Sequence, residues 1–170
     1  MQKITDTFYS YISKNIQYNG NIAGFDLDWT IIKPIYGKFS KDSNDNVFME
    51  NRINILKKLQ DDGYTIIIFT NQKVTKRFIL STRIDRINNI IMMLHNIKIY
   101  PVILMATGDD IYRKPGVGMW NYINYNNQCN YAFYSGDAAG RTKDFSDSDR
   151  QFAINIGIPF YTPEELFKYK

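Results

Sequence analysis

The chain has 170 residues, of which 44% are hydrophobic, 15% aromatic and 22% charged, and its formal net charge is +4. This composition excludes a disordered or collagen-like chain. The longest apolar runs, at residues 64–70 and 99–106, are too short to cross a membrane, and the first residues do not form a secretory signal. The single Cys129 excludes an internal disulfide and a cysteine zinc site. We therefore expect an intracellular protein, in the nucleus or the cytoplasm.

Strand and helix patterns alternate along the chain. Residues 1–20 carry apolar side chains at helical spacing and predict an N-terminal helix or extended arm, and residues 30–46 predict a loop or small flap. Strands are predicted at residues 22–27, 64–69, 99–106 and 131–135, and helices at 48–60, 81–94, 117–125, 150–156 and 163–167. This alternation predicts a single α/β domain over residues 1–170, with a central parallel sheet between two layers of helices.

Short polar motifs follow the predicted strands. They are Asp26-x-Asp28-x-Thr30, Thr70-Asn71-Gln72, Lys114-Pro115 and Gly136-Asp137. In a parallel α/β sheet, ligands bind outside the carboxyl ends of the strands. Each motif is weak evidence alone, but their order and their strand context together predict one reaction site.

The residue types suit hydrolysis of a phosphate ester. Asp26 could attack phosphorus and form an aspartyl-phosphate, and Asp28 could protonate the leaving oxygen and later take a proton from water. We expect burial and the neighbouring anion to raise the pKa of Asp28 for the first of these steps. Thr70 offers a hydroxyl to the phosphoryl oxygens, and Lys114 brings positive charge to the transition state. Asp26, the Asp28 carbonyl and Asp137 are oxygen ligands suited to Mg²⁺.

The motifs also carry a family resemblance over about residues 22–167. The segments that carry it are residues 25–30, 68–72, 112–115 with 118–120, 136–141 with 144–146 and 149–150, and 157–165. They resemble the 3'-phosphatase domain of polynucleotide kinase/phosphatase, in the haloacid dehalogenase superfamily. The resemblance implies a haloacid-dehalogenase-like core without a large cap domain. It further implies Mg²⁺-dependent removal of terminal 3'-phosphates from nucleic acid, with DNA favoured, in end processing for DNA repair.

The same resemblance implies roles for single residues. Asp26 and Asp28 match the nucleophile and the acid/base, Lys114 matches the family lysine, and Asp137 matches the metal acid. The further metal carboxylate is assigned to Asp144, with the choice among Asp144, Asp147 and Asp149 left open. The residues expected to bind substrate are Thr70, Asn71, Gln72, Arg77, Arg113 and Arg141.

Basic residues near the strand ends could form a track for a nucleic-acid backbone. They are Lys38, Lys41, Lys73, Lys76, Arg77, Arg113, Arg141 and Lys143. Trp29, Tyr36 and Tyr112 are candidates for stacking on bases, whereas Trp120 on a helix is expected in the core.

The sequence contains no Gly-x-x-x-x-Gly-Lys-[Ser/Thr] motif, so we expect a stand-alone phosphatase without a kinase half. We expect it to be monomeric, to bind nucleic-acid 3' ends and to bind no membrane. Two alternatives stay open: a phosphatase of the same superfamily that acts on a small molecule, and a non-catalytic module that binds DNA ends.

Overall fold

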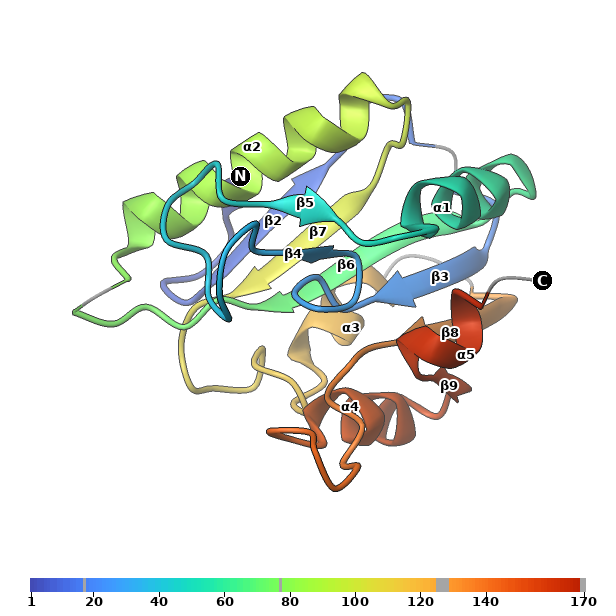
Figure 1. Ribbon diagram of the computed structural model, residues 1–170. Helices are drawn as coiled ribbons and strands as arrows, with labels where there is room; N and C mark the ends of the chain where they lie inside the picture. Colours follow the sequence, from blue (N-terminus) through green and yellow to red (C-terminus); the bar gives the residue numbers. More distant parts are fainter. Residues whose placement is uncertain (17, 77, 125–128, 169–170) are drawn as a thin grey trace.

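The computed structural model describes residues 1–16, 18–76, 78–124 and 129–168, and is built around one seven-stranded sheet (Figure 1). In spatial order the strands are β1 (Gln2–Lys3), β2 (Phe8–Ile12), β7 (Val102–Ala106), β6 (Thr65–Asn71), β3 (Asn21–Phe25), β8 (Tyr131–Ser135) and β9 (Phe160–Tyr161). Strands β7, β6, β3, β8 and β9 run parallel, so the predicted central parallel sheet is confirmed. Because β6 and β8 both pair with β3, three motif-bearing strands lie side by side.

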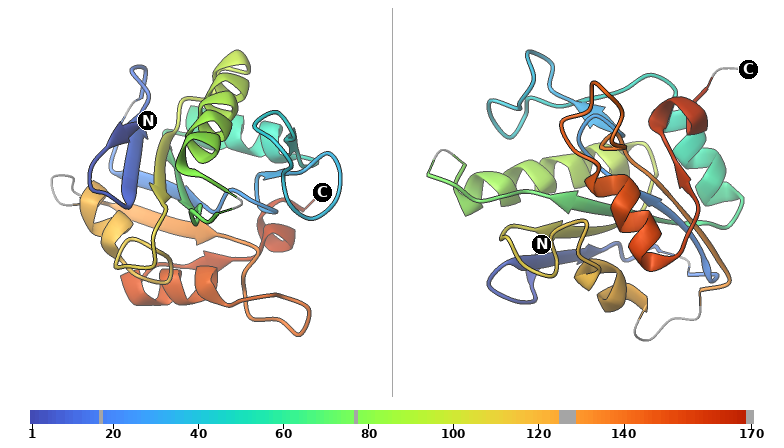
Figure 2. Two further views of the ribbon diagram at one scale, coloured as in Figure 1. Left: turned by 90° about the vertical axis from the view of Figure 1, so that its left-hand side faces the viewer. Right: turned by 90° about the horizontal axis from the view of Figure 1, so that it is seen from below.

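Helices cover both faces of the sheet, as Figure 2 shows. The helices α1 (Arg52–Asp61), α2 (Leu80–Asn96) and α5 (Pro163–Leu166) lie over one face, and α3 (Gly118–Asn124) and α4 (Ser148–Ile156) lie over the other. The expected three-layer arrangement is therefore confirmed.

The central strands are apolar on both sides because each side meets a helical layer. Along β6, Ile66 and Ile68 join the core under α1 and α2, whereas Ile67 and Phe69 join the core under α3 and α4. All four side chains are at most 1% exposed. Successive strand residues point to opposite faces, so a continuous apolar run is the pattern that a doubly covered strand requires.

The first residues form strands, so of the two predicted forms, a helix or an extended arm, the helix is wrong. Strand β2 pairs antiparallel with β7 from Phe8 to Ile12, and β1 pairs antiparallel with β2. Phe8 enters one core and Tyr9 enters the other, which a strand permits because consecutive residues point to opposite faces. Pairing with β7 outweighed the helix-like spacing, and the aromatic residues of β2 favour a strand.

The predicted flap is confirmed over residues 30–46. It is framed by a small antiparallel sheet of β4 (Ile32–Lys33) and β5 (Val47–Phe48). Within it, the Asp45 carboxylate accepts hydrogen bonds from the backbone N–H groups of Ile35 at 2.8 Å and Lys41 at 2.9 Å. These bonds fold the flap back on itself.

Helix boundaries differ from the prediction by a few residues. Helix α1 begins at Arg52, not at Phe48, since residues 47–48 form β5. Helix α2 begins at Leu80, one residue before the predicted start at Ser81, and no side chain caps it. Among the described helices, none combines the length and the apolar character needed to span a membrane.

Removing the anchor of the N-terminal strand should destabilise the whole domain. Phe8 is fully buried and stacks on Tyr112 with ring centroids 4.5 Å apart. We expect Phe8→Ala to lower the free energy of unfolding by about 3 to 5 kcal/mol, measured by urea denaturation. Ile12→Ala is the matched control, because this side chain on the same strand is 50% exposed and should cost well under about 1 kcal/mol. A loss in Phe8→Ala as small as that in Ile12→Ala would show that β2 is not an integral part of the fold.

Candidate functional site

The polar motifs meet at the carboxyl ends of the parallel strands. Asp26 directly follows β3, Thr70 lies near the end of β6, and Asp137 follows β8. Lys114 lies on the loop between β7 and α3. Because β3 lies between β6 and β8, these loops surround the first aspartate.

Lys114 is the centre of the site. Its ammonium group donates hydrogen bonds of 2.7 Å each to Asp26 Oδ1, Asp149 Oδ1 and the Tyr134 hydroxyl. The backbone of Lys114 is fixed by Asn71, which accepts from its N–H at 3.0 Å and donates to its carbonyl at 3.1 Å. Lys114 is 3% exposed, so its charge acts in a largely water-free environment.

Three carboxylates form an acidic group beside the lysine. Asp26, Asp137 and Asp149 each offer an oxygen within 4.8 Å of the other two. Asp149 accepts a hydrogen bond of 3.0 Å from the Ala138 N–H. Only glycine fits at Gly136, because an added Cβ would lie 2.4 Å from the Asp149 carboxyl carbon.

One lysine does not neutralise the charge of three neighbouring carboxylates, of which Asp149 is the most deeply buried. Burial raises the pKa of Asp26 well above its usual value, Lys114 opposes this, and Asp149 and Asp137 raise it further. Burial, together with the charge of Asp149, also raises the pKa of Asp137 to about 7. An all-oxygen, anionic donor set of this kind fits a hard divalent cation such as Mg²⁺. The three acids are therefore the residues that could hold the metal.

Asp28 lies in a different electrostatic environment from the one predicted. Burial acts to raise its pKa, but the charge of Arg86 and hydrogen bonds from Arg86 and Gln72 outweigh burial and lower it. The Arg86 guanidinium contacts both carboxylate oxygens, at 2.5 and 3.2 Å. The expected upward pKa shift is wrong for this arrangement, because the residue that faces Asp28 is a cation.

The Thr70-Asn71-Gln72 motif holds residues of the site in place through hydrogen bonds. The Gln72 amide donates to Asp28 Oδ2 at 2.7 Å and to the Thr70 hydroxyl at 2.8 Å. Thr70 is 1% exposed. Gln72 therefore links the β6 motif to Asp28, while Asn71 positions the Lys114 loop.

The structure corrects two expectations in the loop before α4. Asp144 accepts from the backbone N–H groups of Ala139 and Arg141 and from the Arg141 guanidinium, at 2.8 to 3.1 Å, and stays outside the acidic group. Asp149 takes the place expected for Asp144. Arg141 also pairs with Glu164 at 2.7 Å and does not line the groove, so its charge is used within the protein.

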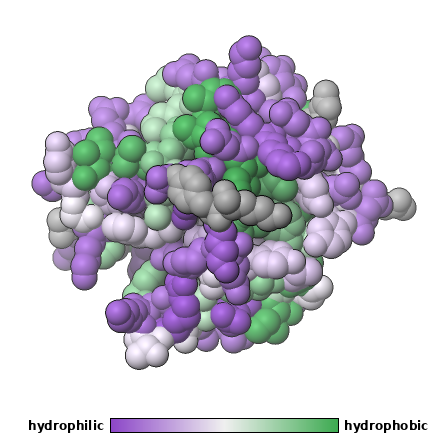
Figure 3. Space-filling view, turned by 45° about the vertical axis from the view of Figure 1, so that its right-hand side comes forward, coloured by the Kyte–Doolittle hydropathy of each residue, from purple (hydrophilic) through white to green (hydrophobic). Residues whose placement is uncertain are grey.

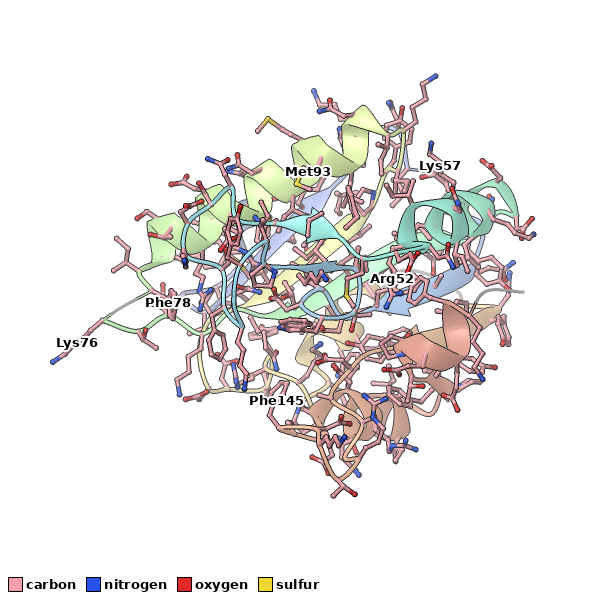
Figure 4. The ribbon with its side chains drawn as sticks, in the orientation of Figure 1. Arg52, Lys57, Lys76, Phe78, Met93 and Phe145 are labelled. Carbon is pink, nitrogen blue, oxygen red and sulfur yellow. The ribbon has the colours of Figure 1, made fainter. Side chains whose placement is uncertain are left out.

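The catalytic motifs open into a groove of about 1010 Å³. Its walls carry cations and aromatic side chains: Trp29, Lys38, Phe39, Phe78, Arg83, Arg113, Lys143 and Phe145. Of the aromatic side chains, Trp29, Phe39 and Phe145 are exposed. Figure 4 shows Phe78 on the loop before α2, at the end of the molecule toward which the strands point, and Phe145 below it on the loop before α4. Another face, drawn in Figure 3, is mostly hydrophilic, with hydrophobic side chains between the polar ones.

The predicted basic track is present only in part. Lys38, Arg113 and Lys143 line the groove, although Arg113 Nε also lies 3.3 Å from Asp109 Oδ1. Among the described residues, Arg113 Nη1 is buried without a hydrogen-bond partner. Lys73 likewise pairs with Asp109 and does not line the groove. Of the stacking candidates, Trp29 lines the groove, Tyr36 and Tyr112 do not, and Trp120 is in the core as expected. Arg77 lies outside the described residues, so its expected contact with substrate stays a prediction.

Three residues of the site are absent from the sequence prediction: Tyr134, Arg83 and Arg86. Residue 134 falls within a predicted strand, and its hydroxyl contacts Lys114 and Asp149. Residue 86 falls within a predicted helix, and its side chain is buried. The only available signal was a charged residue next to the buried apolar positions of α2.

The model of the family described as "Polynucleotide kinase 3 phosphatase" matches residues 21–167. The chain belongs to this family. The family model covers the five parallel strands and every residue of the site described above, and the resemblance carried by the motifs is confirmed.

Curated relatives of this phosphatase family member differ in length. The chain is 35% identical, over 96% of its own length, to a bifunctional polynucleotide phosphatase/kinase of Schizosaccharomyces pombe, and covers 41% of that protein. It is also 35% identical, over 94% of its length, to an uncharacterised 20.8 kDa protein of Autographa californica nuclear polyhedrosis virus, and covers 92% of it. The chain thus spans less than half of one relative and nearly all of the other.

Solved structures agree with the fold. A HAD-like phosphatase from Mesorhizobium loti superimposes with a TM-score of 0.76 over 92% of this chain and 78% of the other, at 14% identity. A heptose bisphosphate phosphatase from B. bronchiseptica, in complex with magnesium and phosphate, gives a TM-score of 0.66 at 20% identity, over 84% of this chain and 79% of the other. The family member therefore has the haloacid-dehalogenase-like fold.

The acidic group should bind Mg²⁺ at a cost to the stability of the metal-free protein. Asp137→Asn removes one of three crowded negative charges, so we expect it to raise the melting temperature in EDTA by roughly 2–4 °C, equivalent to about 1 kcal/mol. At pH 8, where Asp137 is ionised, Mg²⁺ should raise the melting temperature of the parent chain but not of this variant.

Asp144→Asn is the matched control for this measurement. Asp144 lies on the same loop but outside the acidic group, so this variant should keep the response to Mg²⁺. A response that is lost in Asp144→Asn and kept in Asp137→Asn would contradict the assignment of the metal ligands.

Proposed function

We propose that this chain is a polynucleotide 3'-phosphatase, which removes a terminal 3'-phosphate from DNA and leaves a 3'-hydroxyl during end processing for repair. The observation that carries the proposal is the position of Asp26. It lies at the end of the central strand, held by Lys114 on one oxygen and beside two further carboxylates, at the base of an open groove. Membership of the family supports the same reaction.

Asp26 serves as the nucleophile in the first step. Lys114 binds Oδ1, and the side-chain hydrogen bonds to Asp26 in the described part of the chain all reach this oxygen. Oδ2 is therefore the atom that attacks phosphorus. A bond forms between Oδ2 and phosphorus, and the bond from phosphorus to the 3'-oxygen breaks with its electron pair on oxygen. Asp28 gives that oxygen a proton.

Asp28 serves as the base in the second step. It accepts a proton from a water molecule, the water oxygen bonds to phosphorus, and the bond from phosphorus to Asp26 breaks, which releases inorganic phosphate. Arg86 favours the ionised form of Asp28 that this step needs. The bound phosphate of the substrate brings further negative charge and raises the pKa of Asp28, which favours the protonated form in the first step.

Asp26, Asp137 and Asp149 are the side chains that would hold Mg²⁺. When bound there, the ion supplies positive charge that offsets the carboxylates and the phosphate. Lys114 adds a fixed positive charge on the Asp26 side, and Asn71 and Tyr134 hold the lysine in place.

The groove favours a polynucleotide over a small phosphate ester. Phe39 and Phe145 line it with 73% and 84% of their surface exposed, and exposed apolar side chains that gather around one groove commonly mark a binding site. Lys38, Lys143 and Arg113 lie on the same walls. Aromatic faces that stack on bases, together with cations that track phosphates, are the usual elements of a single-strand binding site.

Phosphate release from matched oligonucleotides tests the proposal. We expect release in the presence of Mg²⁺ from a DNA strand with a 3'-phosphate, and none from the same strand with a 5'-phosphate. EDTA should abolish release. Comparing phosphate release from matched RNA strands with that from DNA strands measures the preference for DNA. Efficient hydrolysis of small sugar phosphates alone would favour the small-molecule phosphatase, and binding of ends without hydrolysis would favour the non-catalytic module.

Replacing the nucleophile should separate binding from catalysis. Asp26→Asn keeps the size of the side chain but removes the attacking oxygen anion, so we expect turnover to fall on the order of 10⁴-fold or more. Binding of a 3'-phosphorylated strand, measured by fluorescence anisotropy, should persist. Substantial turnover in this variant would remove Asp26 from the mechanism.

The groove aromatics should matter for oligonucleotides only. Phe145→Ala removes one stacking surface, worth about 1–3 kcal/mol per base, so we expect KM for a 3'-phosphorylated strand to rise roughly 5- to 150-fold. Hydrolysis of 4-nitrophenyl phosphate should change little. Ile154→Ala on α4 is the control, because Ile154 is also exposed but does not line the groove. An unchanged KM in Phe145→Ala would exclude stacking at this position.

A further inference from the structure

Arg86 holds Asp28 with the geometry of a clamp. Its two terminal nitrogens reach the two oxygens of one carboxylate, Nη2 at 2.5 Å from Oδ1 and Nη1 at 3.2 Å from Oδ2. A planar guanidinium that binds a carboxylate through two parallel hydrogen bonds fixes both its position and its rotation. The carboxylate of Asp28 is therefore oriented by a residue 58 positions away on α2.

Arg86 is itself fixed by two neighbours. Its Nε donates to Asn46 Oδ1 at 2.9 Å, and Nη1 also donates to Gln72 Oε1 at 3.3 Å. Gln72 completes the arrangement, because its amide donates to Asp28 Oδ2 at 2.7 Å. Asn46 is the last residue of the flap, so the hydrogen bonds of Arg86 connect α2, the flap and the β6 motif.

Arg86 and Asp28 both line the groove, but Arg86 is nearly inaccessible there and Asp28 is not. The side chain of Arg86 is 4% exposed and that of Asp28 is 36% exposed. Four of the donor directions of the guanidinium are already directed to Asn46, Gln72 and the two Asp28 oxygens. Arg86 is therefore placed to act through Asp28 and not on the phosphate itself.

We propose that Arg86 is a positioning residue for proton transfer by Asp28, an inference that rests on the proposed phosphatase function. The clamp keeps the Asp28 carboxylate in one orientation toward the leaving 3'-oxygen and the attacking water. Positioned acids and bases contribute about 10²- to 10⁴-fold to a rate, so loss of orientation reduces the chemical step. Binding of the oligonucleotide should change little, since the hydrogen bonds of Arg86 are directed to Asn46, Gln72 and Asp28.

A double-mutant cycle tests this role. We would measure single-turnover rates and half-saturating enzyme concentrations on a 3'-phosphorylated DNA strand for the parent, Arg86→Gln, Asp28→Asn and the double variant. Arg86→Gln should slow the step roughly 10- to 100-fold, as is typical for residues that orient a functional ligand, with little change in half-saturation. In the Asp28→Asn background the same substitution should change the rate less than about 3-fold.

Two further variants separate positioning from a merely structural role. Asn89→Ala removes hydrogen bonds from α2 to the flap at Ser43 and Asn44, without touching Asp28, and should keep the parental rate. Arg86→Lys keeps the positive charge but cannot form the two parallel hydrogen bonds of the guanidinium. Its rate should therefore lie between the rates of Arg86→Gln and the parent. Melting temperatures of all variants report whether each one is folded.

The outcomes distinguish the two proposals. Equal rate losses from Arg86→Gln in the parent and in Asp28→Asn would overturn the positioning role, as would a change in half-saturation alone. A parent that releases no phosphate from any oligonucleotide would overturn the proposed function and the positioning role together.

Discussion

The site depends on one buried ammonium group shared among anions. Lys114 contacts Asp26 and Asp149 at 2.7 Å each, and Asp137 lies in the same acidic group. Three carboxylates around one lysine leave an excess of negative charge that burial makes costly. The fold tolerates this arrangement because the strand ends and the first turn of α4 fix the carboxylates in place. The same excess of charge makes the site suited to a divalent ion and a phosphate ester.

Two aspartates only two residues apart therefore have pKa values that are shifted in opposite directions. Asp26 shares its cation with two other acids, and its pKa is raised, whereas Asp28 has Arg86 largely to itself, and its pKa is lowered. Enzymes that use two carboxylates in different roles commonly separate them by environment in this way. In this chain the separation arises because one side chain faces the loop after β7 and the other faces α2.

The groove above these residues is built from segments far apart in the sequence. The flap supplies Lys38 and Phe39, the start of α2 supplies Arg83, and the loop before α4 supplies Lys143 and Phe145. Each segment is anchored by its own hydrogen bonds, such as those of Asp45 in the flap and Asp144 in the loop before α4. The charged residues used as anchors, including Arg141, are thereby not available to a substrate.

The sequence by itself determined the central strands and the first members of the site. Continuous apolar runs are typical of strands buried on both faces, and polar residues directly after them lie at the carboxyl edge, so Asp26 and Asp137 could be placed without coordinates. Lys114 lies farther along the loop after β7, and its motif placed it. Tertiary structure alone decided that residues 8–12 pair with β7, that Asp149 and not Asp144 joins the acidic group, and that Arg86 clamps Asp28. These outcomes depend on contacts between distant segments, and a local pattern of residues carries no information about which distant partner a side chain meets.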